Sequence, residues 1–148
     1  MEALTNFELE DYAKQLRLPL IDVCSKDQLP AFKVGSYYIN MQDSTDGDGS
    51  HWTLLKIFDD QHALYFDSFG IYPPKNITDR IKNVPYSNRE IQDIHSDACG
   101  YFVLACDKYM STKRKPILEQ FDDFLNIFKN PKQNDTILAD YLKSNGIV

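Results

Sequence analysis

The chain has 148 residues, of which 43% are hydrophobic, 26% charged and 13% aromatic. This balance predicts one globular domain over residues 1–148 with a packed core, and it excludes an intrinsically disordered chain. The formal net charge of −6 argues against nucleic acid as a partner, because an acidic surface repels a phosphate backbone.

The N-terminal segment predicts a helix. Thr5 and Glu8 have the spacing of a capping box, apolar residues recur at helical intervals as far as Leu16, and Pro19 ends the helix. The segment is acidic and amphipathic, unlike a secretory signal. No apolar run reaches the ~18 residues that a membrane span needs. We therefore expect a soluble protein without a membrane partner.

A three-stranded sheet is predicted after a loop that runs through Pro30. Three segments rich in β-formers follow one another, with short polar turns between them, at 34–41, 51–58 and 62–70. This pattern predicts an antiparallel meander. IQDI (91–94) suggests a further short strand.

The second half of the chain predicts mainly helices. The segment ACGYFVLACDKYM (98–110) is apolar on nearly all sides and predicts a buried central helix, capped by Ser96 or Asp97. Shorter helical patterns occur around 77–82, 117–128 and 136–143. The expected fold is α+β, a small antiparallel sheet packed on the central helix.

The three cysteines are too few and too irregularly spaced for a disulfide framework or a zinc site, so we expect reduced, intracellular thiols. Cys99 falls in the first turn of the central helix, where unpaired N–H groups and the helix dipole stabilise a thiolate. Gly100 beside it permits a close approach of backbone. The alternative role is a buried core cysteine, which is the role expected of Cys106. Cys24, in a predicted loop, is assigned no role.

A nucleophilic cysteine needs a base, and the chain has three histidines. His51 begins a predicted strand after a polar turn, from which its ring can project into a cleft. His62 is expected at an exposed hairpin turn. His95 lies four residues before Cys99, and the local pattern favours His51 over His95 only slightly.

An acidic residue is expected to orient the histidine. Asp67 ends the apolar run ALYF on the strand that should pair with the strand of His51. Burying a carboxylate without a partner costs free energy, so an acid in this apolar run is expected to have one. Asp67 is therefore the candidate for orienting His51. Its alternative role is to cap the following turn.

Two other patterns are not expected to bind ligands. Ser44, Asp46, Asp48 and Gly49 imitate the first half of an EF-hand loop, but the twelfth position is Leu55 instead of Glu. The basic run at 113–115 is too short for a nucleic-acid site and is expected to be a solvated helix junction. We therefore expect neither a metal nor a cofactor.

Four segments in order, GSHWTLL (49–55), YFDSFG (65–70), Gln92 and SDACGYFVL (96–104), resemble the adenovirus-type (adenain-like) cysteine proteases. These are distant relatives of the SUMO and NEDD8 deconjugating proteases. The resemblance covers residues 34–110. The segment LTNFELEDYAKQL (4–16), the LP that follows it and YFDSFG (65–70) are also similar to the maturation proteases of virophages and Polinton-type mobile elements. It implies a papain-like fold and the catalytic residues His51, Asp67, Gln92 and Cys99.

The resemblance also implies more specific roles. Gln92 would bind the oxyanion, and Trp52 and Gly100 would line a narrow substrate channel, although Trp52 can equally be a core aromatic. The implied function is a cysteine endopeptidase that cleaves capsid protein precursors after Gly. It would act in the cytoplasm or viral factory of an infected cell and be packaged in the virion.

The chain also differs from adenovirus proteases. Asp67 stands where they use Glu, as in SUMO proteases. No cysteine lies between Asp67 and Gln92 to accept a disulfide-linked activator peptide, and the chain is acidic, so activation by DNA is not expected. One alternative is an isopeptidase that removes a ubiquitin-like modifier. Another is a binding module with a decayed active site, although all four polar residues are present.

Overall fold

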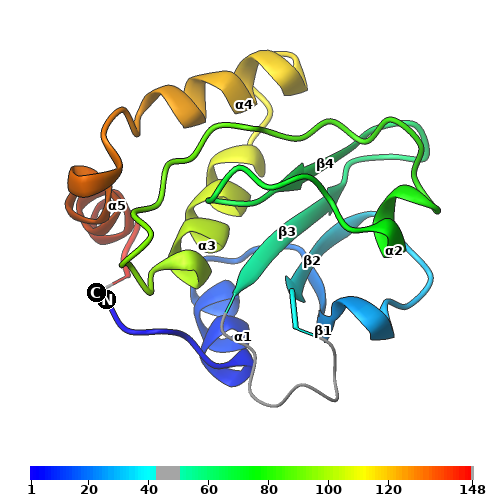
Figure 1. Ribbon diagram of the computed structural model, residues 1–148, viewed down its shortest axis with the longest axis horizontal. Helices are drawn as coiled ribbons and strands as arrows, with labels where there is room; N and C mark the ends of the chain where they lie inside the picture. The colour runs from blue at the N-terminus through cyan, green and yellow to red at the C-terminus, as the bar shows by residue number, and fades with distance from the viewer. Residues whose placement is uncertain (43–50, 148) are drawn as a thin grey trace.

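The structure is a computed structural model that describes residues 1–42 and 51–147 (Figure 1). The polar turn predicted at 43–50, with its EF-hand-like residues, lies outside the described residues. The elements follow in the order α1 (Asn6–Gln15), β1 (Leu20–Ser25), a 3-10 turn (Lys26–Gln28), β2 (Gly35–Asn40), β3 (Trp52–Ile57), β4 (Ala63–Phe66), α2 (Lys75–Thr78), α3 (Cys99–Met110), α4 (Ile117–Asn126) and α5 (Pro131–Ser144).

The strands form one four-stranded sheet in the order β1-β2-β3-β4. The antiparallel meander of β2, β3 and β4 is confirmed. The prediction that the whole sheet is antiparallel is wrong, because β1 pairs with β2 in parallel. β1 was not predicted because it is an edge strand with mostly exposed or half-buried side chains, and Asp22 interrupts its apolar residues.

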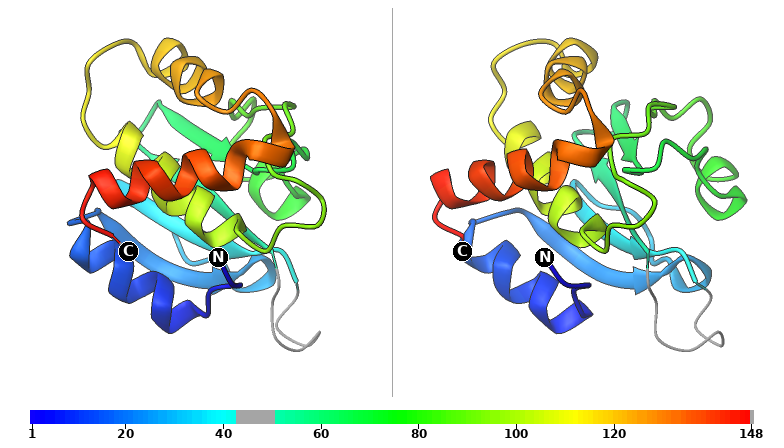
Figure 2. Two further views of the ribbon diagram at one scale, coloured as in Figure 1. Left: turned by 90° about the vertical axis from the view of Figure 1, so that its left-hand side faces the viewer. Right: turned by 60° about the vertical axis from the view of Figure 1, so that its left-hand side comes forward.

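The sheet is buried on both faces. Side chains that alternate along the strands point to opposite sides, so Tyr38 and Leu54 enter one core cluster and Tyr37 and Leu55 enter another. Helices α1, α3, α4 and α5 pack on the first face, and α2 covers part of the second (Figures 1 and 2). The residues of β2 and β3 are therefore buried along almost the whole of each strand.

Helix boundaries follow local chemistry. The capping box of α1 is present, since Thr5 and Glu8 each accept the other's backbone N–H. The central helix α3 begins at Cys99 with Ala98 as its N-cap and no side-chain capping bond, so the cap expected from Ser96 or Asp97 is wrong. The Ser96 hydroxyl instead accepts the N–H of Ala98, one residue before the helix. Helix α5 begins earlier than predicted, at Pro131. Proline suits the first turn of a helix, because the N–H groups there have no partner within the helix.

The strand predicted at 91–94 does not form. The backbone N–H groups of Ile91 and Gln92 both donate to the carbonyl oxygen of Ser68, at 2.9 and 3.1 Å. The segment is therefore tied to the turn after β4 instead of pairing along a strand. Among residues 1–42 and 51–147, no helix is long and apolar enough to cross a lipid bilayer.

A buried ion pair joins α3 to the sheet. Lys56 Nζ on β3 lies 2.6 Å from Asp107 Oδ1 on α3, and both side chains are almost fully buried. The hydroxyl groups of Ser36 and Tyr38 donate to the same carboxylate, at 2.7 and 2.6 Å. Lys56 also donates to Ser111 Oγ at 3.1 Å. These contacts compensate the loss of hydration that burial of two charges entails.

Replacing Asp107 with Ala should therefore lower the free energy of unfolding by about 3–5 kcal/mol, because Lys56 would remain buried without its charge partner. Urea unfolding of the purified variant measures the change. Removing the exposed partner Asp79 from its pair with Lys75 (side chains 60% and 86% exposed) is the matched control, and should cost less than about 1 kcal/mol. Equal losses in the two variants would contradict the prediction.

Candidate active site

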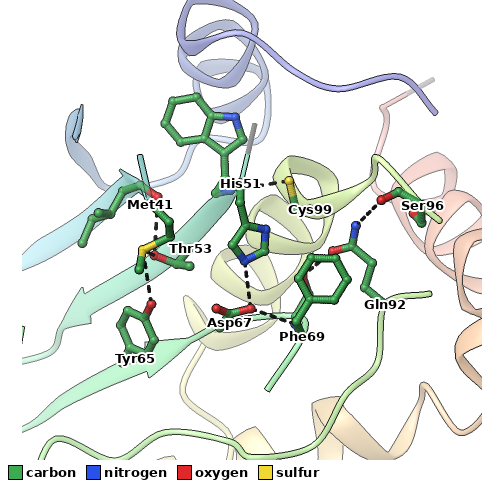
Figure 3. Close-up of polar contacts among 12 residues, drawn as sticks. Met41, His51, Thr53, Tyr65, Asp67, Phe69, Gln92, Ser96 and Cys99 are labelled. Atoms are coloured by element: carbon green, nitrogen blue, oxygen red, sulfur yellow. Dashed lines mark hydrogen bonds and ion pairs between the residues drawn. The ribbon is translucent and has the colours of Figure 1, made fainter. Parts of the chain in front are cut away.

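The candidate base and its orienting acid come from neighbouring strands. His51 immediately precedes β3, and Asp67 immediately follows β4. Because these strands are antiparallel, the start of β3 lies beside the end of β4. Side chains of alternate residues point to the same face of a sheet, so those of His51 and Asp67 can meet there. His51 Nε2 lies 2.9 Å from Asp67 Oδ1 (Figure 3).

Asp67 is held in place by the turn that follows it. The side chain is only 1% exposed, and its Oδ1 also accepts the backbone N–H of Phe69 at 2.8 Å. The ring of Phe69 stacks on the imidazole of His51, with centroids 4.8 Å apart. The carboxylate and the aromatic ring of one short segment therefore fix both the direction and the plane of the imidazole.

Gly70 closes this turn. Its N–H donates to the carbonyl oxygen of Asp67 at 2.8 Å, and its φ of +74° lies in the region that side chains rarely adopt. A Cβ at this position would lie 2.8 Å from the backbone of Asn88 and Arg89. A glycine is therefore required for the turn and for the approach of the segment that leads to Gln92.

The candidate nucleophile lies at the start of α3. Cys99 is 2% exposed, and its Sγ accepts the backbone N–H of Trp52 at 3.5 Å. His51 also hydrogen-bonds to Cys99. Because Nε2 of the imidazole faces Asp67, Nδ1 is the nitrogen available to the thiol. The imidazole thus bridges an acid and a thiol, as proton transfer from Cys99 requires.

The protonation of His51 is set by these partners. Burial alone lowers the pKa of His51, but hydrogen bonds to Asp67 and Cys99, together with the negative charges of both groups, raise it to about 9. The imidazole is therefore protonated at neutral pH whenever the two groups beside it are ionised. Both partners therefore favour the protonated form of the imidazole.

Gln92 lies beside the segment that enters α3. Its side chain is buried, its Oε1 accepts from the hydroxyl of Ser68, and its Nε2 donates to the carbonyl oxygen of Ser96 at 2.8 Å (Figure 3). The amide is therefore held at both ends, close in the chain to Cys99. A fixed N–H donor near a nucleophile can stabilise the negative oxygen of a tetrahedral intermediate.

The two residues expected to line a substrate channel contact the chain's own N-terminal segment. The indole Nε1 of Trp52 donates to the carbonyl oxygen of Leu4 at 2.9 Å. A Cβ on Gly100 would lie 3.1 Å from Leu4 Cδ1, so Gly100 permits this close packing. Trp52 is a core residue in this arrangement, and a role in substrate binding stays a prediction for both positions.

The other histidines and cysteines lie apart from this constellation. His95 and His62 are exposed, and His62 pairs with Asp59 on the surface. Burial and the charge of Asp22 raise the pKa of Cys24 to about 12, which makes it a poor nucleophile. Cys106 is fully buried, and burial raises the pKa of its thiol well above the ordinary value.

Phe69 and Ser68 were not assigned roles from the sequence, although both occur in the YFDSFG segment. Their position directly after Asp67 was the available signal. No known family model matches the chain, and no curated protein matches it either. In the part of the chain that the structure describes, no three side chains of the metal-ligating types form a cluster.

Replacing Asp67 with Asn should lower the pKa of His51 from about 9 toward its ordinary value of 6.5, since the charged acceptor is lost and burial remains. In the wild type, protonated His51 contributes stability that is complete below about pH 6.5 and is lost as the pH rises through about 9. An NMR titration of the imidazole measures the shift.

Asp59→Asn, which removes a similar but exposed partner from His62, is the matched control and should leave the His51 titration unchanged. A wild-type His51 that already titrates near its ordinary value, or one that does not respond to Asp67→Asn, would contradict the assignment of Asp67 as its partner.

Proposed function

We propose that the protein is a cysteine peptidase with Cys99 as nucleophile, His51 as acid–base group and Asp67 as the residue that orients His51. The observation that carries the proposal is the placement of one imidazole against both a buried carboxylate, at 2.9 Å, and the thiol at the start of α3. A structural cysteine needs neither partner, whereas a nucleophile needs both.

The reaction is acyl transfer in two steps. His51 takes the proton of the Cys99 thiol, and Sγ attacks the peptide carbonyl carbon. The carbonyl oxygen becomes an oxyanion, which accepts hydrogen bonds from Gln92 Nε2 and from the Cys99 N–H at the first turn of α3. When the C–N bond breaks, His51 gives its proton to the leaving amine.

The thioester that remains is then hydrolysed. Water attacks the acyl carbon while His51 accepts a proton from it, and the return of that proton to Sγ restores the thiol. Asp67 holds the imidazole in position and stabilises the imidazolium. The high pKa of His51 supports this division of roles, because a protonated imidazole is ready beside the leaving group.

Replacing Cys99 with Ala or His51 with Ala should abolish peptide hydrolysis, since each removes one half of the same nucleophilic step. His95→Ala and Cys24→Ala are matched controls and should keep the wild-type rate. The measurement is turnover of a fluorogenic peptide, with circular dichroism as a check on folding. Hydrolysis that survives Cys99→Ala would refute the proposal, and loss of activity in His95→Ala alone would identify a different base.

The substrate proposal rests on the resemblance to the adenovirus-type proteases. It names capsid protein precursors as substrates, cleaved after Gly in the course of viral maturation. Incubation of candidate precursors with the enzyme and sequencing of the new termini should give cuts that follow Gly and that disappear when this Gly becomes Val. Cuts after basic or large aromatic residues would contradict it. Preferential reaction with a ubiquitin-like vinyl sulfone would instead favour the isopeptidase alternative.

A further inference from the structure

Ser68 lies in the chain between Asp67 and Phe69, the two residues that orient His51, but its side chain contacts Gln92 instead. Its side chain is fully buried, and its hydroxyl donates to Gln92 Oε1 at 2.5 Å. Its carbonyl oxygen accepts the backbone N–H groups of Ile91 and Gln92. Both the backbone and the side chain of Gln92 are therefore attached to this one serine.

The contacts of the Gln92 amide allow one orientation. Its Nε2 donates to the carbonyl oxygen of Ser96, which can only accept a hydrogen bond. Its Oε1 accepts from Ser68, which donates. Rotation of the amide by half a turn would bring Oε1 against the Ser96 carbonyl oxygen and leave two acceptors facing each other. The two contacts therefore fix which end of the amide is the donor.

We propose that Ser68 is a positioning residue that holds the Gln92 amide ready to donate to the oxyanion, an inference that rests on the proposed peptidase function. An amide nitrogen carries two N–H bonds. Among the described residues, Nε2 donates to Ser96 alone, so its second N–H can serve the substrate. Ser68 acts through Gln92 and does not itself touch the substrate.

The position of Ser68 also links the two halves of the site. Asp67 directs the imidazole of His51, Phe69 stacks on that ring, and Ser68 between them directs Gln92. One turn of the chain thereby sets the acid–base group and the oxyanion donor relative to each other. A small displacement of either group is costly, because catalysis depends on their relative placement.

Removing the hydroxyl group of Ser68 should slow only the step in which the oxyanion forms. Ser68→Ala should lower kcat by about 10- to 10²-fold and leave KM nearly unchanged, since the donor is lost mainly in the transition state. The rate at which iodoacetamide alkylates Cys99 should not change, because that reaction displaces iodide from a saturated carbon and forms no oxyanion. Damage to His51 or Asp67 would slow both reactions.

A double-mutant cycle tests whether Ser68 acts through Gln92. Gln92→Ala alone should lower kcat by about 10²–10³-fold. Adding Ser68→Ala to this variant should have no further effect on kcat, because the group that Ser68 positions is gone. Ser144→Ala is the control: the hydroxyl of Ser144 donates to the carbonyl oxygen of Asp140 within α5, a helix that carries none of the site residues, and its loss should leave kcat unchanged.

Several outcomes would overturn the inference. Additive losses in the double mutant, a wild-type kcat in Ser68→Ala, or equal slowing of alkylation and turnover would each do so. If the wild-type protein hydrolyses no peptide, the proposed function fails separately. The side-chain amide NMR signals of Gln92 then still decide whether Ser68 holds this group. They should be slow to exchange with water in the wild type and fast in Ser68→Ala, and equal exchange in the two proteins would overturn the inference.

Discussion

The buried ion pair between Lys56 and Asp107 fixes how α3 lies on the sheet, and the candidate site depends on that placement. Cys99 precedes Asp107 by eight residues, a rise of about 12 Å in a helix. Trp52 precedes Lys56 by four residues, a rise of about 13 Å in a strand. These lengths agree, so the pair at one end of α3 and the Trp52–Cys99 contact at the other end can form together.

The turn after β4 also organises the candidate site, through close backbone packing and through polar contacts. Gly70 lets the chain reverse and lets the following segment approach to a distance that a Cβ would prevent. That approach brings Gln92 to Ser68, while the same turn presents Asp67 to His51. Ser68, Gln92 and Oδ1 of Asp67 are hydrogen-bonded, which limits the cost of removing them from water, whereas Asp67 Oδ2 is buried without a hydrogen-bond partner among the described residues.

Much of the secondary structure could be predicted from local patterns. The capping box of α1, the β2–β4 meander and the apolar α3 with Cys99 at its start each have a signal within a short stretch of chain. Strand β1 had no such signal, since an exposed edge strand lacks alternating burial. The 91–94 segment has a β-type sequence, but the N–H groups of Ile91 and Gln92 donate to the carbonyl oxygen of Ser68, more than twenty residues away in the chain.

The sequence by itself determined which chemical groups were available: three thiols, three imidazoles, an acid in an apolar run and a glutamine before the central helix. Only the tertiary structure decided which of them meet. It separates His51 from the exposed His95, and it shows that Trp52 and Gly100 pack against Leu4. The physical reason is that residue type and periodicity determine local conformation and burial. Contacts such as the one between His51 and Asp67 depend on strand register and helix placement, which long-range packing sets.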